Sequence, residues 1–412
     1  MEDYLSEAHR PQVVQKWRTL ILLALAELLA MAVWFSASAV VPALTADWSL
    51  TTGGQAWLIM SVQIGFVVGA LTSAIFSLAD RIPARIFFTA SALLAALATA
   101  LIPLLNGGLA LALPLRFLTG VFLAGVYPVG MKIMATWTQR DRGLGIGLLV
   151  GALTVGSATP HLINAFGGVT AWQPVLYVAA LSAVIAAIIA WLFVQDGPYA
   201  VMAPPFHWGQ IGHIVRDREV MLANLGYLGH MWELYAMWTW IPAFIFASFA
   251  EVGVSERWAS VAAFTVIGIG GLGSLLAGKF ADQMGRTTIT IISLIVSGLA
   301  SLTVGFFFGG DPRLLMIVLL IWGFAVVADS AQFSAAVSEL TDGSYLGTAL
   351  TLQTSLGFLL TLFTIRMIPP LQTAVTWRYA FMILAIGPAV GIWAMWRLRH
   401  SPSATKLANG RK

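Results

Sequence analysis

The sequence contains no cysteine and few charged residues. Among its 412 residues, 10% are Asp, Glu, Lys or Arg, and 59% are hydrophobic. The lack of cysteine excludes disulfides and thiolate metal sites. Soluble domains carry about 25% charged residues, so this chain has too few polar groups to cover a water-exposed surface. Disordered chains and disulfide scaffolds are excluded by the same composition, which leaves a membrane-embedded protein.

The sequence also lacks motifs that recruit a cofactor or power an enzyme. No Walker phosphate loop is present, so we expect no direct use of ATP. His207 and His213 have no partners at metal-ligand spacing, and no Ser-His-Asp set or carboxylate pair has enzymatic spacing. We therefore expect no cofactor, no metal and no enzymatic activity. Basic residues on cytoplasmic loops explain the net charge of +4 without a nucleic-acid partner.

Long apolar runs separated by helix breakers predict an all-α membrane protein. A spanning helix needs about 20 apolar residues, and twelve runs qualify. The first six are Leu20–Ala43, Ala56–Ala79, Phe87–Leu105, Ala110–Ala135, Gly143–Phe166 and Pro174–Val194. The second six are Val220–Phe249, Ala259–Ala281, Thr288–Gly309, Leu314–Ala336, Gly347–Ile368 and Arg378–Leu398.

The longest polar stretch divides these spans into two sets of six. We predict a cytoplasmic N-terminal segment, two six-helix bundles, a cytoplasmic linker and a cytoplasmic tail. The N-terminal segment is 1–19, the first bundle 20–194, the linker 195–219, the second bundle 220–398 and the tail 399–412. Glycines four residues apart, at Gly65 with Gly69 and at Gly147 with Gly151, are interpreted as positions of close helix packing.

The distribution of Lys and Arg predicts the orientation of the chain. One set of alternate loops holds only Arg257, Arg313 and Arg378, whereas the other set is rich in basic residues. Because basic loops stay in the cytoplasm, we expect both termini there, in an inner or plasma membrane. The expected partners are the lipid bilayer, protons and a small-molecule substrate, and the expected state is a monomer.

The two halves repeat at an offset of about 202 residues. The segment around Asp80, Arg81 and Arg85 follows the second span, and the segment around Asp282 and Arg286 follows the eighth. Two parallel six-helix units in one chain are a known transporter architecture.

These loops resemble the signature of the major facilitator superfamily, Gly-x-x-x-Asp-Arg-x-Gly-Arg. The second copy retains Gly278, Asp282, Gly285 and Arg286, whereas Ser77 and Pro83 replace the glycines of the first copy. Arg116 with Gly120 and Gly125 is similar to the family's second motif. The resemblance implies two pseudo-symmetric six-helix bundles, with spans 1, 4, 7 and 10 around a central cavity. It also implies a gating latch, for which the candidates are Asp80, Arg81, Arg85, Asp282 and Arg286.

Five ionisable residues inside the predicted spans are the candidates for proton coupling. A charge at the bilayer centre costs about 2.5–3.5 kcal/mol, so such a side chain should face a cavity or a partner. These candidates lie on spans 1, 4, 7 and 10 and are Glu27, Arg116, His230, Glu233 and Asp329.

Each candidate also has a structural interpretation. Glu27 is a proton carrier or a cation's counter-ion, or else a partner for a neighbouring helix. His230 and Glu233 share a helical face and form either a pair that titrates as a unit or a structural hydrogen bond. Arg116 takes part in coupling, or it balances Glu27 or Glu233 as a buried pair. Asp329 binds a ligand or a proton, or it latches to a basic residue.

Aromatic and polar side chains on the same or flanking spans are candidates for substrate contact. Several share a helical face with an ionisable residue, and one aligns with Asp329 through the repeat. The candidates are Trp34, Gln63, Tyr127, His161, Tyr227, Trp238, Gln332 and Gln353.

The sequence therefore predicts a secondary active transporter that binds a small organic solute near the membrane midplane and works by alternating access. Proton coupling is expected. Three buried acids favour a cationic or amphiphilic compound that is exported, and a buried Arg favours a small anion that is taken up with protons. A polytopic membrane enzyme or a sensor is disfavoured, because the loops are short and the ionisable residues lie at mid-depth.

Overall fold

The computed structural model describes residues 2–138, 141–167, 171–199, 208–342 and 345–412, and within them it contains helices and no strand. His207 and part of the predicted linker lie outside the described residues. The first half contains α1 (Glu2–Met31), α2 (Val41–Trp48), α3 (Thr52–Ile75), α4 (Leu78–Arg81), α5 (Ala84–Leu105), α6 (Gly108–Leu123), α7 (Tyr127–Ala135), α8 (Arg142–Gly167) and α9 (Gln173–Phe193). The second half contains α10 (Ile211–Arg216), α11 (Arg218–Glu251), α12 (Glu256–Met284), α13 (Arg286–Thr303), α14 (Pro312–Ala328), α15 (Ser330–Leu340), α16 (Leu346–Ala380) and α17 (Ile386–Arg399). Short 3-10 segments lie at Ser38–Val40, Trp208–Gln210, Val304–Phe307, Phe381–Ala385 and Pro402–Gly410.

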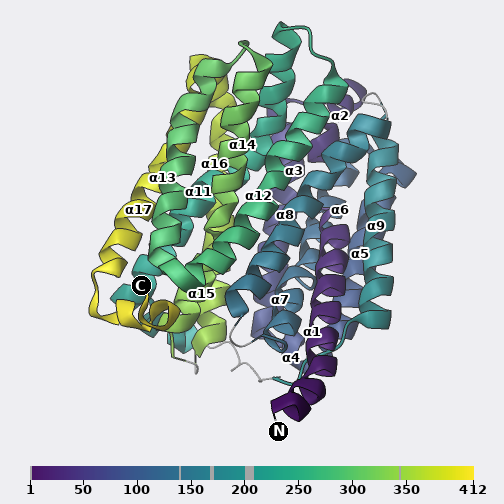
Figure 1. Cartoon of the computed structure of the whole chain (residues 1–412). Coiled ribbons are helices and arrows are strands. Elements are labelled where there is room, and N and C mark those ends of the chain that lie inside the picture. Colours follow the sequence, from purple (N-terminus) through teal and green to yellow (C-terminus); the bar gives the residue numbers. More distant parts are fainter. Residues whose placement is uncertain (1, 139–140, 168–170, 200–207, 343–344) are drawn as a thin grey trace.

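The long helices run side by side through the molecule, as an all-α membrane protein requires (Figure 1). The first half, drawn in purple to blue, lies beside the second, drawn in green to yellow, and both chain ends lie at the same end of the bundle. We call this the terminal end, and the opposite end, which carries α2, the distal end. Packing of α8 against α12 and of α3 against α16 joins the halves.

Nine helical segments of the described chain are long and apolar enough to cross a membrane. One of them, Leu346–Arg399, has 54 residues and covers two predicted spans. It bends where Thr376 leaves the helical conformation (φ 63°, ψ 173°). The helices α1 and α11 are long but are not among the nine. The count of twelve and the predicted bundle bounds stay predictions.

The predicted spans 1, 4 and 10 are interrupted helices. The span 20–43 leaves the α-helix after Met31 and resumes only at Ser38. The span 110–135 breaks between α6 and α7, where Pro128 cannot donate to the preceding turn. The span 314–336 breaks at Asp329. The break at 124–126 and the break at Asp329 are 203–205 residues apart, close to the repeat offset of about 202, so the repeat extends to the irregularities of the backbone.

The glycines predicted to pack helices do so. A Cβ on Gly65 would lie 2.0 Å from the carbonyl oxygen of Phe117, and one on Gly69 would lie 2.4 Å from that of Val121. A Cβ on Gly151 would lie 2.9 Å from the carbonyl oxygen of Gly271 in the other half. These positions allow backbones to approach closely, so they fix the distance between α3 and α6 and between the two halves.

Candidate functional site

A cavity of about 230 Å³ lies between the two halves. Its wall is mostly aromatic and apolar, with a few polar groups, which is the usual character of a small-molecule site. The aromatic residues of the wall come from both halves and include Trp34, Phe66, Tyr127, Tyr227, Trp238 and Phe358.

Four of the eight candidates for substrate contact line this cavity: Trp34, Tyr127, Tyr227 and Trp238. The two tryptophans are nearly fully buried, and neither indole Nε1 has a hydrogen-bond partner among the described residues. Because one indole comes from each half, a single bound solute can contact both halves.

The other four candidates are buried but are not part of the cavity wall. Gln332 accepts a 2.9 Å hydrogen bond from Arg286, and Gln353 accepts one of 3.1 Å from Ser334. The amide of Gln63 and the Nε2 of His161 have no partner within the described chain.

An aromatic cluster joins the halves beside the cavity. The ring of Trp34 lies 5.0 Å from Phe66, 5.6 Å from Phe358 and 6.1 Å from Tyr235, measured between centroids. Phe35 stacks with Tyr235 at 6.2 Å, again between centroids. The non-helical segment after α1 carries both Trp34 and Phe35, so its conformation decides how these rings meet the second half.

Arg116 on α6 holds that segment. Its fully buried guanidinium donates to the carbonyl oxygens of Val33 (2.7 Å) and Trp34 and to Ser36 Oγ (3.3 Å). Backbone carbonyls freed by a helix break need donors in an apolar interior. The expected ion pair of Arg116 with Glu27 or Glu233 is absent from the described residues, because the guanidinium serves this backbone instead.

His230 lies in a row between Asp329, at ion-pair distance, and Ser330, its hydrogen-bond partner. Its Nδ1 is 2.8 Å from Asp329 Oδ1, and its Nε2 is 2.8 Å from Ser330 Oγ. Both His230 and Asp329 are buried, whereas Ser330 is half-buried and lines the cavity together with His230. The expected pairing of His230 with Glu233 is wrong, since the imidazole turns toward Asp329. The sequence spacing did not indicate this row, because the helix break at Asp329 brings together side chains that lie about 100 residues apart in the chain.

Glu27 in the first half and Glu233 in the second half are both buried, and neither is part of the cavity wall. Glu233 accepts hydrogen bonds from Trp322 Nε1 (2.7 Å) and Ser297 Oγ (2.8 Å), which link α11 to α13 and α14. Both carboxyl oxygens of Glu27 lack a partner in the described chain. Its Oε2 packs against Gly130, where an added Cβ would lie 2.8 Å away.

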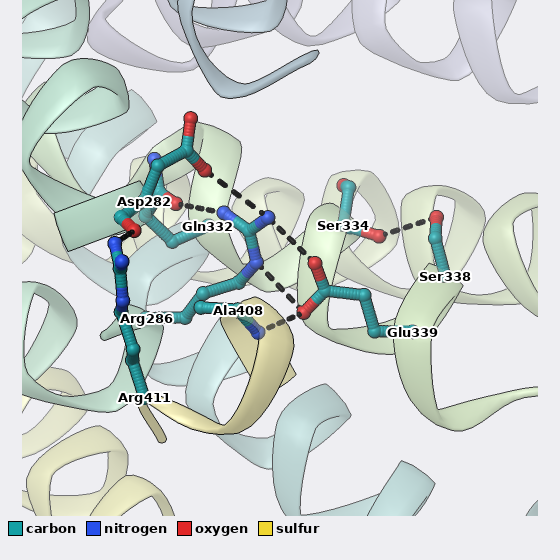
Figure 2. Close-up of polar contacts among 8 residues, drawn as sticks. All are labelled: Asp282, Arg286, Gln332, Ser334, Ser338, Glu339, Ala408 and Arg411. Atoms are coloured by element: carbon teal, nitrogen blue, oxygen red, sulfur yellow. Dashed lines mark hydrogen bonds and ion pairs between the residues drawn. The ribbon is translucent and has the colours of Figure 1, made fainter. Parts of the chain in front are cut away.

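The second signature loop forms an ion-pair network at the terminal end (Figure 2). Arg286 binds both oxygens of Glu339, at 2.6 and 2.8 Å, and lies 3.5 Å from Asp282. Glu339 also accepts from the backbone N–H of Ala408, and Arg411 donates to the carbonyl oxygen of Asp282. The segment after α17 thus completes this network, and neither Glu339 nor this segment was a candidate from the sequence.

The carboxylate of Asp282 reaches across to the first half. A Cβ on Gly143, in the first turn of α8, would lie 2.6 Å from Asp282 Oδ2. This contact closes α12 against α8 near the terminal end.

The first signature loop makes fewer contacts. Asp80 forms a 2.5 Å ion pair with Lys132 of α7, and the guanidinium of Arg85 lies 5.2 Å from the ring of Trp191. Arg81 is exposed at the end of α4. The contacts of Asp80 and Arg85 both stay within the first half.

Together, the paired bundles, the interrupted helices and the cavity between the halves define a membrane carrier. The chain belongs to the Major Facilitator Superfamily, whose family model matches residues 23–359. It is therefore a multi-pass membrane transporter of a family that carries small solutes.

Solved structures of transporters share the fold. The proton:xylose symporter XylE superposes with a TM-score of 0.72 at 14% identity, covering 94% of this chain and 96% of that chain. The human organic anion transporter MFSD10 gives 0.68 at 15% identity, covering 92% and 99%. The nucleoside transporter NupG gives 0.69 at 15% identity, with the same coverage.

One curated relative is similar in sequence over a shorter stretch. The niacin transporter NiaP of Acinetobacter baylyi is 29% identical over 168 residues, which is 38% of this chain. The match covers 36% of the relative's length.

Proposed function

We propose that this protein is a secondary active transporter that moves a small organic carboxylate together with protons by alternating access. The halves would rock about the cavity between them and expose it to each side of the membrane in turn. The cavity of about 230 Å³ is below the range of about 300–1,000 Å³ typical of drug-sized ligands, which supports a small solute.

One observation carries the choice of a carboxylate. Trp34 and Trp238 line the cavity, and their buried indole N–H groups have no acceptor in the described chain. An indole N–H is a donor only, so these groups call for an acceptor on the solute. A carboxylate accepts several hydrogen bonds at once and would satisfy both donors, while its apolar part would pack on the surrounding rings.

The positions of the buried acids give less support for a cationic solute than the sequence alone suggested. Glu27 and Glu233 are not part of the wall, and Asp329 is bonded to His230. Arg116 does not anchor an anion directly either, because backbone carbonyls occupy its guanidinium. The relative NiaP is named as a niacin transporter, and niacin is a small organic carboxylate, which supports the same class.

Proton coupling is proposed to involve Glu27 and the pair His230–Asp329. A carboxyl without partners, as at Glu27, can exist in a membrane as the neutral acid and release its proton when water reaches it. We assign Glu233 and Arg116 supporting roles, since Glu233 is hydrogen-bonded to two neighbouring helices and Arg116 to the non-helical segment after α1. The protein is proposed to act as a monomer in the inner or plasma membrane, with both termini in the cytoplasm.

An exchange assay in proteoliposomes tests the proposal. Vesicles loaded with unlabelled nicotinate, benzoate, a nucleoside or a quaternary ammonium compound would be diluted into the labelled solute. We expect exchange of the carboxylates, with net uptake that increases when the outside is more acidic. Exchange of the cation alone, or carboxylate uptake that ignores the pH gradient, would contradict the proposal.

A further inference from the structure

The row Asp329–His230–Ser330 ends at the cavity, and its last member is a hydroxyl. Ser330 is half-buried, whereas His230 and Asp329 are almost fully buried. Any solute in the cavity can therefore touch the serine oxygen more readily than the imidazole.

The hydrogen-bond roles in this row depend on one proton. In the neutral imidazole, Nδ1–H donates to the Asp329 carboxylate, which leaves Nε2 as an acceptor for the Ser330 hydroxyl. In the protonated imidazole, Nε2–H donates to Ser330 Oγ. The serine can no longer donate to His230, so its own hydrogen becomes available to another acceptor, such as a solute in the cavity that Ser330 lines.

We propose that Ser330 is the residue through which proton binding at His230 controls solute binding in the cavity. With His230 neutral, Ser330 presents lone pairs to the cavity and repels a carboxylate. With His230 protonated, Ser330 donates a hydrogen bond to the carboxylate, and the imidazolium adds a positive charge behind it. The inference rests on the proposed function, and it names the residue and the polarity of the coupling.

The charge and proton balance of this step is simple. One proton from water adds to Nε2, one carboxylate enters, and no covalent bond other than that N–H forms or breaks. The proton and the solute carboxylate carry opposite charges, so the site, with the Asp329 carboxylate included, has the same total charge before and after loading, and solute and proton would cross together. Release of the proton to water on the other side returns Ser330 to its first orientation and weakens solute binding.

Few other ionisable groups face the row. Tyr227 lies one turn earlier on α11, and Tyr127 of α7 belongs to the same cavity wall. Glu233 is on the same helix but is bonded to Trp322 and Ser297. Tyr235, further along α11, also lines the wall, and the described parts of α12, α14, α15, α16 and α17 that pack against α11 add no ionisable side chain to it.

The first arm of the test needs no solute. Protein labelled with ¹⁵N-histidine would be titrated in detergent, and the His230 signals identified by their loss in His230→Gln. Ser330→Ala should change the His230 Nε2 signal and its pH response, whereas Ser330→Thr should preserve both. The control Ser338→Ala lies on the same helix, with its hydroxyl bonded to the Ser334 carbonyl, and should change nothing. Identical His230 signals in Ser330→Ala and the wild type would overturn the proposal.

The second arm measures binding of benzoate, with benzamide as its uncharged analogue, by calorimetry between pH 5 and 8. Wild type should bind benzoate more tightly at low pH and take up a proton with it. A hydrogen bond to a charged group contributes about 1.5–3 kcal/mol, so Ser330→Ala should weaken binding about tenfold or more at low pH. It should also flatten the pH dependence, while Ser338→Ala matches the wild type.

Unchanged benzoate binding in Ser330→Ala would overturn the proposed role of Ser330. If wild type binds no benzoate at any pH, the carboxylate class fails, and the histidine signals still decide whether Ser330 is linked to His230.

Discussion

Arg116 Nη1 donates a 2.7 Å hydrogen bond to the carbonyl oxygen of Val33, and so ties α6 to the non-helical segment that follows α1. The same guanidinium binds the Trp34 carbonyl and Ser36 Oγ. An arginine can serve three acceptors because its donors point in fixed, divergent directions. The position of Trp34 in the cavity wall thus depends on a charged group that does not itself line the cavity.

Replacement of Arg116 by Lys should destabilise this segment. Lysine ends in a single ammonium group and has no planar fork, so it cannot reach both carbonyls and the serine. Each buried acceptor left unpaired costs about 1–3 kcal/mol. We expect a lower melting temperature in detergent and a change in tryptophan fluorescence as Trp34 moves. A variant as stable as the wild type, with an unchanged spectrum, would show that the segment holds its shape without Arg116.

Much of the fold was predictable from the sequence, because the apolar runs and the 202-residue repeat are visible in the order of the residues without knowledge of tertiary contacts. The helix breaks after Met31 and at Asp329 were not predictable, since no proline or glycine marks them. The break at Asp329 brings Ser330 to His230, and for that reason the predicted pairing of His230 with Glu233 failed. Glu339 escaped prediction because its partner Arg286 is 53 residues away in the chain.

Close helix packing predicts a large effect at Gly120. A Cβ there would lie 1.9 Å from the carbonyl oxygen of Val62, which is backbone and cannot move aside. Gly120→Ala should therefore separate α6 from α3, at a cost of about 1–3 kcal/mol or more. Thermal unfolding followed by size-exclusion chromatography would measure it. Gly212→Ala is the control, since nothing lies within 4 Å of its added Cβ, and equal melting temperatures for the two variants would contradict the packing argument.

Glu233→Gln separates a supporting role from a role in proton transfer. The glutamine keeps one acceptor oxygen but turns an N–H₂ group toward either Trp322 or Ser297, so one donor loses its partner. We expect lower thermal stability, while solute uptake keeps its dependence on the pH gradient. Uptake by the variant that no longer responds to the gradient would instead place Glu233 in the proton path.

The network around Arg286 predicts how readily the cavity opens. A lysine at position 286 cannot bind both oxygens of Glu339, so Asp282 should lose its fixed position against the start of α8. Because the protein has no cysteine, Met131→Cys in the cavity wall provides a single label site.

We expect Arg286→Lys to increase the rate of maleimide labelling at this site about fivefold, as the loss of about 1 kcal/mol of closing interactions implies. Arg313→Lys, an exposed change at the distal end, serves as the control. Equal labelling rates with and without Arg286→Lys would show that the network does not hold the cavity closed.

The most direct measurement compares nicotinate binding to the wild type, Trp34→Phe and Trp238→Phe by calorimetry. Phenylalanine keeps the ring but removes the N–H donor, so each variant should bind about tenfold more weakly while eluting as a folded protein. Trp172→Phe should bind as the wild type does, because its indole donates to Asp47 away from the cavity. Full-strength binding in both cavity variants, or no binding of any small carboxylate by the wild type, would contradict a carboxylate site held by the two indoles.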